Sequence, residues 1–289
     1  MRILYHDDLD GRCAGFLVYD FLKKQGKPIE LFAMDYGEPT PFAEGQTFWI
    51  VDFSVSTDDM KRLLEESPEV HWIDHHISSI EKYKDFQHGD WTRDTIYGDR
   101  QDGIAACELT WRHLYQQSLE PDFVRYIGDR DVWAWRYGED TRHFCDGLLA
   151  YETHPKSSIW QELFNDYQYK RDNMEVGFNR HSAVMANGRI ISQYKAIQDV
   201  AYVEKNGIFV TWEGYECYIV NGMYNSTPFE EAVPNADIWI AFRYMAGCYW
   251  SISLYSTKVN VKEIAVKHGG GGHIKAAGFQ GKELPFLPK

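Results

Sequence analysis

Residues 2–11 read Arg-Ile-Leu-Tyr-His-Asp-Asp-Leu-Asp-Gly, so a short apolar run leads directly into a cluster of His and Asp. Two more apolar runs end in the same way, because residues 48–51 are followed by Asp52 and residues 71–73 by Asp74. Short strands that alternate with helical segments are typical of a parallel α/β sheet. Ligands bind such sheets beyond the carboxyl ends of the strands. We therefore expect the polar residues that follow these three runs to converge on one crevice.

The rest of the first 155 residues continues the alternation of strand and helix. Residues 29–34 form another apolar run that predicts a strand. The spacing of apolar residues predicts helices, which cover residues 12–24, 56–64, 102–116 and 122–135. From about 155 to 200 the chain is polar with a helical pattern, which indicates a connecting arm.

A second domain is predicted over residues 201–289, where the pattern changes to β-rich segments separated by turn signals. These segments are residues 200–203, 208–212, 216–220, 238–244 and 249–255, and a short helix is predicted at 259–266. We therefore expect an α/β protein with a parallel-sheet domain, a helical connector and a smaller mixed α/β domain.

The composition limits the classes of partner. Hydrophobic residues make up 44% and charged residues 25% of the 289 residues, as in globular proteins. A net charge of −13 disfavours binding of a long duplex, which needs a basic surface. A short polyanion can still bind where metal ions supply positive charge. The aromatic content of 16% leaves room for stacking surfaces as well as core.

The cysteines and the amino terminus point to an intracellular protein. The five cysteines are widely spaced without a C-x-x-C pair, so we interpret them as reduced thiols. The amino terminus lacks the apolar region of a signal peptide, and no run of about 18 apolar residues could span a membrane. We therefore expect a cytoplasmic protein without a membrane partner.

The first polar cluster has the chemistry of a metal site. His6, Asp8 and Asp10 alternate, so they can point to one side of an extended turn. Carboxylates this close repel one another and favour a bound cation. Oxygen and imidazole ligands together suit Mn²⁺, Mg²⁺ or Fe better than structural zinc. The alternative interpretation is an acidic surface turn.

Three other motifs follow predicted strands or helices. In Asp74-His75-His76, neutral imidazoles can bind metal while a carboxylate fixes the tautomer, although a buried structural His pair is the alternative. Asp52 alone would be a turn residue or a helix cap. In the stretch Gly-Asp-Arg-Asp at residues 128–131, a local salt bridge is the simpler interpretation.

The last motif is a run of glycines at residues 268–273, which read His-Gly-Gly-Gly-Gly-His. Such a run lets backbone N–H groups line an anion site, and a helix that begins there would add its dipole. The alternative is a flexible linker, but Ala-Ala-Gly-Phe at residues 276–279 is a packing sequence and disfavours it.

The order of these motifs along the chain resembles the DHH/DHHA1 phosphoesterase family. The motifs are H-x-D-x-D-G, V-D-F-S, D-H-H, G-D-R-D and G-G-G-G-H-x-x-A-A-G-F, and they extend through nearly the whole chain. The family includes RecJ-type exonucleases, nano-RNases, cyclic dinucleotide phosphodiesterases and phosphatases of 3′,5′-bisphosphorylated nucleosides. The resemblance implies a DHH catalytic domain over residues 1–155, a helical connector over 156–200 and a DHHA1 substrate-binding domain over 201–289.

The resemblance also implies two divalent metal ions, with Mn²⁺ preferred and Mg²⁺ as the alternative. The implied ligands are His6, Asp8, Asp10, Asp52, His75 and one aspartate of residues 128–131. Asp52 is the expected bridge between the metals. Asp129 is preferred for the last position because Gly128 precedes it, as in the family, and Asp131 is the competitor.

Two residues receive catalytic roles from the same resemblance. Asp74 is expected to orient His75. His76 is expected to face the substrate phosphate or the leaving oxygen.

In the second domain the resemblance implies that Gly269, Gly270, Gly271, Gly272 and His273 bind the end of the substrate. One position departs from the family, because Tyr255 stands where an arginine is expected. Tyr255 could donate a hydrogen bond or stack, or it could be an ordinary strand aromatic. Arg243 and Lys258 are candidates to replace the lost charge.

The predicted function is a metal-dependent phosphodiesterase that hydrolyses short single-stranded oligonucleotides to mononucleotides, as the nano-RNases do. The alternatives within this class are hydrolysis of linear or cyclic dinucleotides and a nucleoside 3′,5′-bisphosphate phosphatase. An alternative of another class is a catalytically silent nucleotide-binding module. A homodimer is compatible with the sequence.

Overall fold

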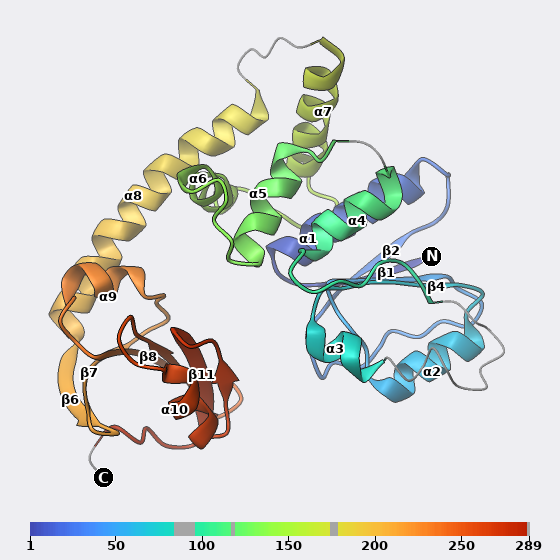
Figure 1. Ribbon diagram of the computed structural model, residues 1–289. Helices are drawn as coiled ribbons and strands as arrows, with labels where there is room; N and C mark the ends of the chain where they lie inside the picture. Colours follow the sequence, from blue (N-terminus) through green and yellow to red (C-terminus); the bar gives the residue numbers. More distant parts are fainter. Residues whose placement is uncertain (84–95, 117–118, 174–178, 288–289) are drawn as a thin grey trace. The chain divides into compact units, whose positions relative to one another are not determined.

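The computed structural model describes residues 1–83, 96–116, 119–173 and 179–287 (Figure 1). The chain divides into two compact units, Met1–Ser192 and Gln193–Lys289. Residues 174–178 of the expected connecting arm lie outside the described residues. The division into a catalytic domain, a connector and a substrate-binding domain stays a prediction.

The first unit contains a parallel sheet of five strands in the order β2-β1-β3-β4-β5. The strands are β1 (Arg2–His6), β2 (Glu30–Met34), β3 (Phe48–Val51), β4 (Val70–Ile73) and β5 (Ile96–Tyr97). The register places Tyr5 beside Val51, and Val51 beside Ile73. The carboxyl ends of β1, β3 and β4 therefore meet at one edge of the sheet, which confirms the predicted convergence.

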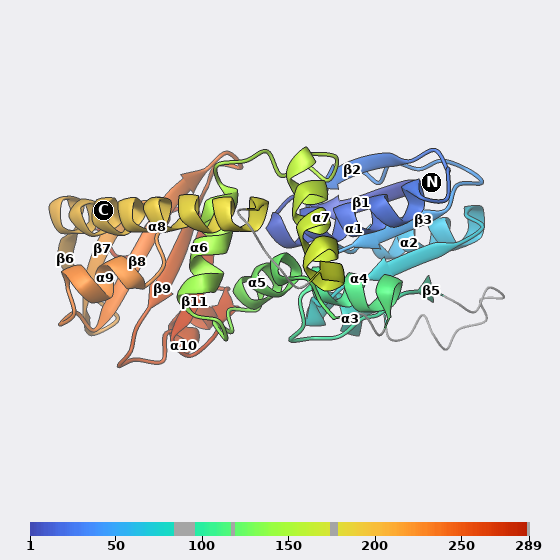
Figure 2. The ribbon, with the colours of Figure 1, turned by 90° about the horizontal axis from the view of Figure 1, so that it is seen from above.

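Helices cover both faces of this sheet (Figure 1). Six helices of this unit have the bounds α1 (Leu9–Lys23), α2 (Thr57–Glu66), α3 (Ile77–Lys82), α4 (Ala106–Tyr115), α5 (Asp122–Asp131) and α6 (Glu139–Leu148), and α7 spans Ser158–Asn173. Ile3 and Tyr5 of β1 pack in the core with α1, α4 and α7. Leu4, their neighbour on the opposite face, packs in the core with Met60 of α2. Figure 2 shows α7 crossing beside α1, where the rings of Phe16 and Trp160 stack.

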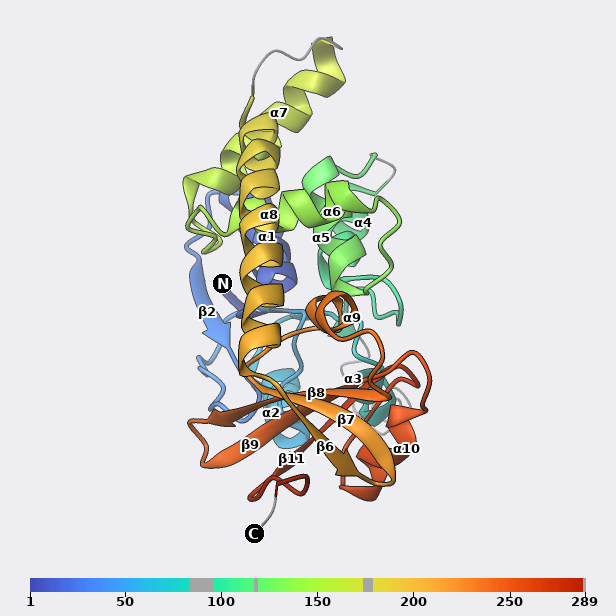
Figure 3. The ribbon, with the colours of Figure 1, turned by 90° about the vertical axis from the view of Figure 1, so that its left-hand side faces the viewer.

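Helix α8 (Arg180–Asn206) is the longest helix of the described residues and runs from the first unit into the second (Figure 3). The prediction of a β-rich segment at residues 200–203 is wrong, because these residues form the last turns of α8. Val203 is fully buried, and its carbonyl accepts a hydrogen bond from the Tyr218 hydroxyl. A short apolar run fits a buried helix turn as well as a strand, so periodicity alone cannot separate the two.

The second unit is built on a mixed sheet of six strands in the order β10-β11-β9-β8-β7-β6. The strands are β6 (Ile208–Trp212), β7 (Tyr215–Asn221), β8 (Ile238–Met245), β9 (Tyr249–Tyr255), β10 (Gly271–Gly272) and β11 (Ala276–Gly281). Only β7 and β8 pair in parallel among these strands. One face packs on α10 (Val261–Lys267), and the other packs on the end of α8 and on α9 (Thr227–Ala232).

The predicted α/β class is confirmed by these two sheets. Across the described ranges, no helix combines the length and apolar character that a membrane crossing requires.

Candidate metal centre

The candidate site lies at the edge where the strands of the parallel sheet end. His6 is the last residue of β1, Asp52 follows β3, and residues 74–76 follow β4. Gly11, at the start of α1, allows the helix to approach the strand end closely. A Cβ at Gly11 would lie 2.2 Å from the carbonyl oxygen of His6. The glycine of the H-x-D-x-D-G motif is thus required by packing, and it brings Asp8 and Asp10 next to His6.

One group of ligand atoms forms around His6. Its Nδ1 lies 2.8 Å from Oδ2 of Asp8 and 3.7 Å from Oδ2 of Asp52. Asp8 also caps α1, where its Oδ1 accepts a hydrogen bond from the N–H of Gly11. His6, Asp8 and Asp52 each offer an atom close enough to the others to hold one metal ion.

A neighbouring group forms around His75. Its Nε2 lies 3.2 Å from Oδ1 of Asp52, 3.3 Å from Oδ2 of Asp131 and 3.9 Å from Oδ2 of Asp10. Asp10, His75 and Asp131 can together hold a metal ion. Asp52 therefore turns one oxygen toward each group, which is the arrangement of a carboxylate that bridges two metals.

The charges at this site call for cations. Burial raises the pKa of Asp10 to about 8, and the nearby Asp52 carboxylate adds to this shift. Burial and repulsion from Asp10 raise the pKa of Asp131 to about 7. Asp52 is only 1% exposed, and its buried Oδ1 accepts no hydrogen bond from the residues that the structure describes. Buried carboxylates without enough hydrogen bonds are stabilised by metal ions, so the donor set fits divalent cations.

The raised pKa values of the imidazoles reflect the same excess of negative charge. The carboxylates of Asp52 and Asp8, which lie beside the ring, raise the pKa of His6 to about 10. Burial lowers the pKa of His75, but Asp52 and Asp10 outweigh this effect and raise it to about 9. In each case a proton takes the place that a metal ion would fill, because both stabilise the clustered carboxylates.

The structure separates the two aspartates that the sequence left in competition. Asp131 lies beside His75, as described above. Asp129 is fully buried, and its carboxylate accepts hydrogen bonds from Arg136, Tyr137 and Thr141. These bonds hold the pKa of Asp129 below its usual value in spite of burial. Asp129 is not among the groups able to hold a metal in the described part of the chain. Of the two aspartates, Asp131 thus lies within reach of the other candidate ligands and the preferred Asp129 does not, and the identity of the last metal ligand stays a prediction.

The carboxylate of Asp74 orients a different histidine from the one expected. Its Oδ1 lies 2.7 Å from Nδ1 of His76 and also accepts hydrogen bonds from the backbone N–H groups of His75 and His76. No side-chain bond between Asp74 and the His75 ring is present among the described residues. The expectation that Asp74 fixes the ring of His75 is thus replaced by a bond to His76, which is 35% exposed at the site.

Sequence reasoning missed two aromatic residues near the centre. The ring of Tyr36 lies 5.9 Å from the ring of His6 and 6.2 Å from that of His76, and it is half exposed. Trp133 follows Asp131 by two residues and is 58% exposed. The only signal in the sequence was an aromatic residue close to a polar motif, which is too common to select either residue.

The glycine run of the second unit follows a helix instead of starting one. Helix α10 ends at Lys267, near the predicted bounds of 259–266, and the run continues into β10, so it has no helix N-terminus to add a dipole. A Cβ at Gly270 or at Gly272 would collide with β11, which explains two of the glycines by packing. Gly271 has open space around its missing side chain.

The backbone of this run is largely paired within the unit. The N–H groups of Gly269, Gly270 and His273 donate to carbonyl oxygens of the same unit. A hollow of about 580 Å³ lies beside the run and is lined by Ser251, Ser253, Gly269, Gly270, Gly278 and Gln280, with Ile252 and Phe279. The binding of a substrate end by residues 269–273 stays a prediction.

Tyr255 and the two candidate cations, Arg243 and Lys258, lie in the second unit. Tyr255 pairs with Trp239 and Ala276 in the sheet and is partly buried. The ammonium of Lys258 donates to the carbonyls of Asn235 and Ala236, so it closes a turn. Arg243 is exposed near the end of β8, beside Ser251 of the next strand. Of the two, Arg243 has the more accessible charge.

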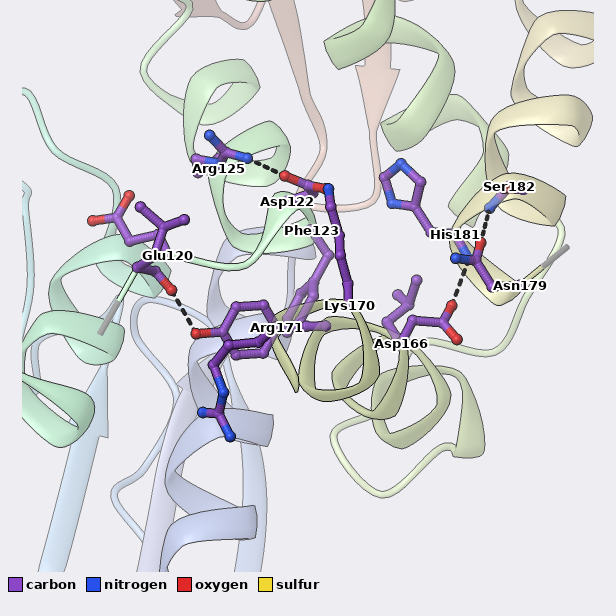
Figure 4. A pocket seen from close by; sticks show the side chains of 13 residues that line it. Glu120, Asp122, Phe123, Arg125, Asp166, Lys170, Arg171, Asn179, His181 and Ser182 are labelled. Carbon is purple, nitrogen blue, oxygen red and sulfur yellow. Dashed lines mark hydrogen bonds and ion pairs between the residues drawn. The ribbon is translucent and has the colours of Figure 1, made fainter. Parts of the chain in front are cut away.

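A further cavity of about 550 Å³ lies among α5, α7 and the start of α8 in the first unit (Figure 4). Its walls are mostly apolar, and three of its charged residues pair with one another. Asp122 bonds to Arg125 and Lys170, and Asp166 accepts the backbone N–H of His181. The groups able to hold a metal, within the described ranges, lie elsewhere. This cavity therefore has no part in the candidate centre.

The fold and this site can now be compared with known proteins. No protein-family model matches the chain. The DHH domain of a member of the s1p family of ribosomal proteins superposes with a TM-score of 0.55 at 13% identity, over 97% of this chain and 82% of that chain. The chain thus has the fold of a DHH-domain protein. The fold that the resemblance to the DHH/DHHA1 family predicted is thereby confirmed.

Two curated proteins are similar in sequence. An uncharacterised protein of Acanthamoeba polyphaga mimivirus is 24% identical over 193 residues, which are 63% of this chain and 43% of that protein. The bifunctional oligoribonuclease and PAP phosphatase NrnA of Mycoplasma pneumoniae is 33% identical over 95 residues, which are 29% of each. Each match spans less than half the length of the relative.

Proposed function

We propose that this protein is a metal-dependent phosphoesterase that hydrolyses short single-stranded oligonucleotides. The observation that supports this most is the position of Asp52, whose two carboxylate oxygens face the His6 group and the His75 group separately. Two divalent cations at these positions, Mn²⁺ or Mg²⁺, would activate a water and neutralise the charge that develops on a phosphoryl group.

The residues of the chain have distinct tasks in this proposal. His6, Asp8 and Asp52 hold one cation, and His75, Asp10 and Asp131 hold the other, with Asp52 shared.

His76 is the proposed general acid. Its Nδ1 is bonded to Asp74, which leaves Nε2 free to point toward a leaving oxygen. The hydrogen bond to Asp74 also raises the pKa of His76, so a larger fraction of the ring is protonated at a given pH. A protonated imidazole near the site can give that proton to the oxygen that departs.

The substrate class is supported by the relative and by the charge. NrnA of Mycoplasma pneumoniae is an oligoribonuclease by name. The net charge of −13 disfavours a long strand, whose phosphates would be repelled outside the metal centre. The proposed role of residues 269–273 and Tyr255 is to bind the end of a short substrate.

A nucleoside 3′,5′-bisphosphate is the second candidate substrate, since the same relative is also a PAP phosphatase by name. Linear and cyclic dinucleotides are further candidate substrates. The test is a panel of these compounds and of oligonucleotides of increasing length, assayed with Mn²⁺ and with Mg²⁺.

We expect the highest kcat/KM for an oligonucleotide of a few residues and a decline with greater length. Asp52→Asn should abolish hydrolysis, whereas Asp58→Asn should not, because the Asp58 side chain is 96% exposed on α2. A wild-type protein that binds nucleotides but hydrolyses none of the panel would favour the silent binding module instead.

A further inference from the structure

The segment that follows Asp131 has an unusual backbone. Trp133 and Trp135 both have left-handed conformations, with φ of 55° and 53°. Such angles cost about 1–3 kcal/mol for each residue other than glycine, and they persist where the surroundings enforce them. Bulky residues rarely adopt them. Two tryptophans in this conformation within three residues therefore require an explanation.

Burial in a core does not explain Trp133, because this side chain is 58% exposed. Large aromatic side chains are mostly buried in proteins, since their exposure to water is unfavourable. The strained backbone thus presents Trp133 outward instead of packing it.

Asp129 enforces this conformation. Its carbonyl accepts the N–H of Ala134, and its carboxylate accepts the backbone N–H groups of Arg136 and Tyr137. The side chains of Arg136 and Thr141 bond to the same carboxylate. The segment 132–137 is therefore closed onto the end of α5 by one buried residue. This gives Asp129 a positioning role in place of the metal-binding role expected for it.

Trp135 supports Trp133 from the inner side of the segment. The two rings meet edge to face with centroids 4.9 Å apart. The guanidinium of Arg142 lies 5.6 Å from the ring of Trp135, in a cation–π contact. The Trp133 ring thus has a packing partner and still remains 58% exposed.

The position of Trp133 relative to the metal centre follows from the chain. Asp131 is in the His75 group, and the Cα of a residue two positions further lies within about 7 Å. This limit joins the Cα atoms of the two residues, and a long, exposed indole attached so close to a candidate metal ligand can reach the base of a nucleotide whose phosphate binds there.

We propose that Trp133 is the base-stacking residue of this site. It binds a nucleobase of the substrate on its exposed face, while the adjoining phosphate occupies the metal centre. This inference rests on the proposed phosphoesterase function and adds to it a residue that selects nucleotides over other phosphate esters.

The experiment compares two substrates that differ only in their bases. One is a dinucleotide, and the other is the same sugar–phosphate backbone with hydrogen in place of each base. Trp133→Gly removes the ring and relieves the left-handed strain, so it should fold at least as well as the wild type. Trp133→Phe keeps an aromatic face. Tyr169→Ala, on α7, is the matched control because Tyr169 is also 58% exposed.

For Trp133→Gly we expect kcat/KM on the dinucleotide to fall by about 5- to 150-fold, the range for loss of one stacked base. Hydrolysis of the base-free substrate should stay within about twofold of the wild type. Trp133→Phe should recover part of the loss, and Tyr169→Ala should change neither activity.

The outcomes separate this inference from the proposed function. A wild-type protein with no activity on either substrate would overturn the phosphoesterase proposal. Activity that falls equally on both substrates in Trp133→Gly, or on neither, would overturn the stacking role while the function stands. Metal content and the unfolding midpoint of each variant show whether the fold and the centre are intact.

Discussion

Exchanging each of the two aspartates at the end of α5 for asparagine separates metal binding from stability. In Asp129→Asn, the amide nitrogen is expected on the side of Thr141, because a hydroxyl can turn to accept a hydrogen bond, whereas the Arg136 N–H groups only donate. The N–H of Tyr137 then loses its acceptor. This bond is only partly buried, so its loss costs about 0.5–1.5 kcal/mol, the usual net contribution of one hydrogen bond.

The second contribution comes from the lost charge. Arg136 bonds to a carboxylate through its backbone N–H and its Nε, and a neutral acceptor weakens such bonds by about half, or about 1 kcal/mol. We therefore expect Asp129→Asn to lower the free energy of unfolding by about 1.5–2.5 kcal/mol. Urea unfolding measures this as a lower midpoint at an unchanged slope.

Asp131→Asn should have the opposite profile. Burial and repulsion from Asp10 raise the pKa of Asp131 to about 7, so its charge is unfavourable in the metal-free fold. Removing this charge should leave the metal-free protein as stable as before or more stable, while elemental analysis shows less metal per chain. The assignment is refuted if Asp129→Asn loses metal at full stability while Asp131→Asn keeps its metal and unfolds more easily.

Four further predictions test other parts of the structure. Gly11→Ala should destabilise the fold by more than about 3 kcal/mol and reduce metal content, because its Cβ would lie 2.2 Å from the His6 carbonyl oxygen. Gly271→Ala, where the side chain would enter open space, should be tolerated. The unfolding midpoints of the two variants test this, and equal effects would contradict the packing argument. Chelation of the metal should lower the melting temperature, because a ligand at 100 times its Kd adds about 2.7 kcal/mol to the free energy of unfolding. Calorimetry with EDTA and with added Mn²⁺ measures the shift, and an unchanged midpoint would exclude metal binding to the fold. His76→Gln should keep the metals and slow turnover by about 10²–10⁴, so a variant that loses metal would argue for a ligand instead of an acid. Burial lowers the pKa of His71, so below about pH 6.5 the unfolded chain binds more protons than the folded chain, and the free energy of unfolding falls by at most about 1.4 kcal/mol per pH unit. His71→Phe keeps the stack on Trp49 and should lose less stability than the wild type between about pH 7.5 and 5.5. An equal loss in both proteins would show that His71 does not contribute.

The parallel sheet and the meeting of its polar strand ends at one edge could be predicted because the signals were local. The apolar runs that end at His6, Asp52 and Asp74 mark strand ends, and the topology of parallel sheets gathers such ends at one edge. Strands β6 and β9 were predicted with their observed bounds, since turn residues such as Glu213 and Gly214 separate them from their neighbours.

The choice between Asp129 and Asp131 depended on information that the sequence lacks. Two residues along a helix differ by about 200° in direction, so these carboxylates point to opposite sides of α5. Which side faces the sheet edge is set by the rotation of the helix in its packing, to which Phe123 and Ile127 contribute. The partner of Asp74 was similarly undetermined, because His75 and His76 are adjacent and only the backbone after β4 decides which ring turns back.

The backbone at Asp52 narrows what can stand at this position. Its φ of 56° is left-handed, and among residues other than glycine, Asn and Asp tolerate this conformation best. Glycine offers no ligand, and asparagine has a single oxygen, so neither can join two cations. A glutamate has the chemistry but a less compatible backbone preference. Aspartate alone satisfies both demands, and replacement by Asn or Gly would leave the fold intact while removing the bridge. In the proposed enzyme, a single substitution at Asp52 would thus leave a protein that binds nucleotides without hydrolysing them.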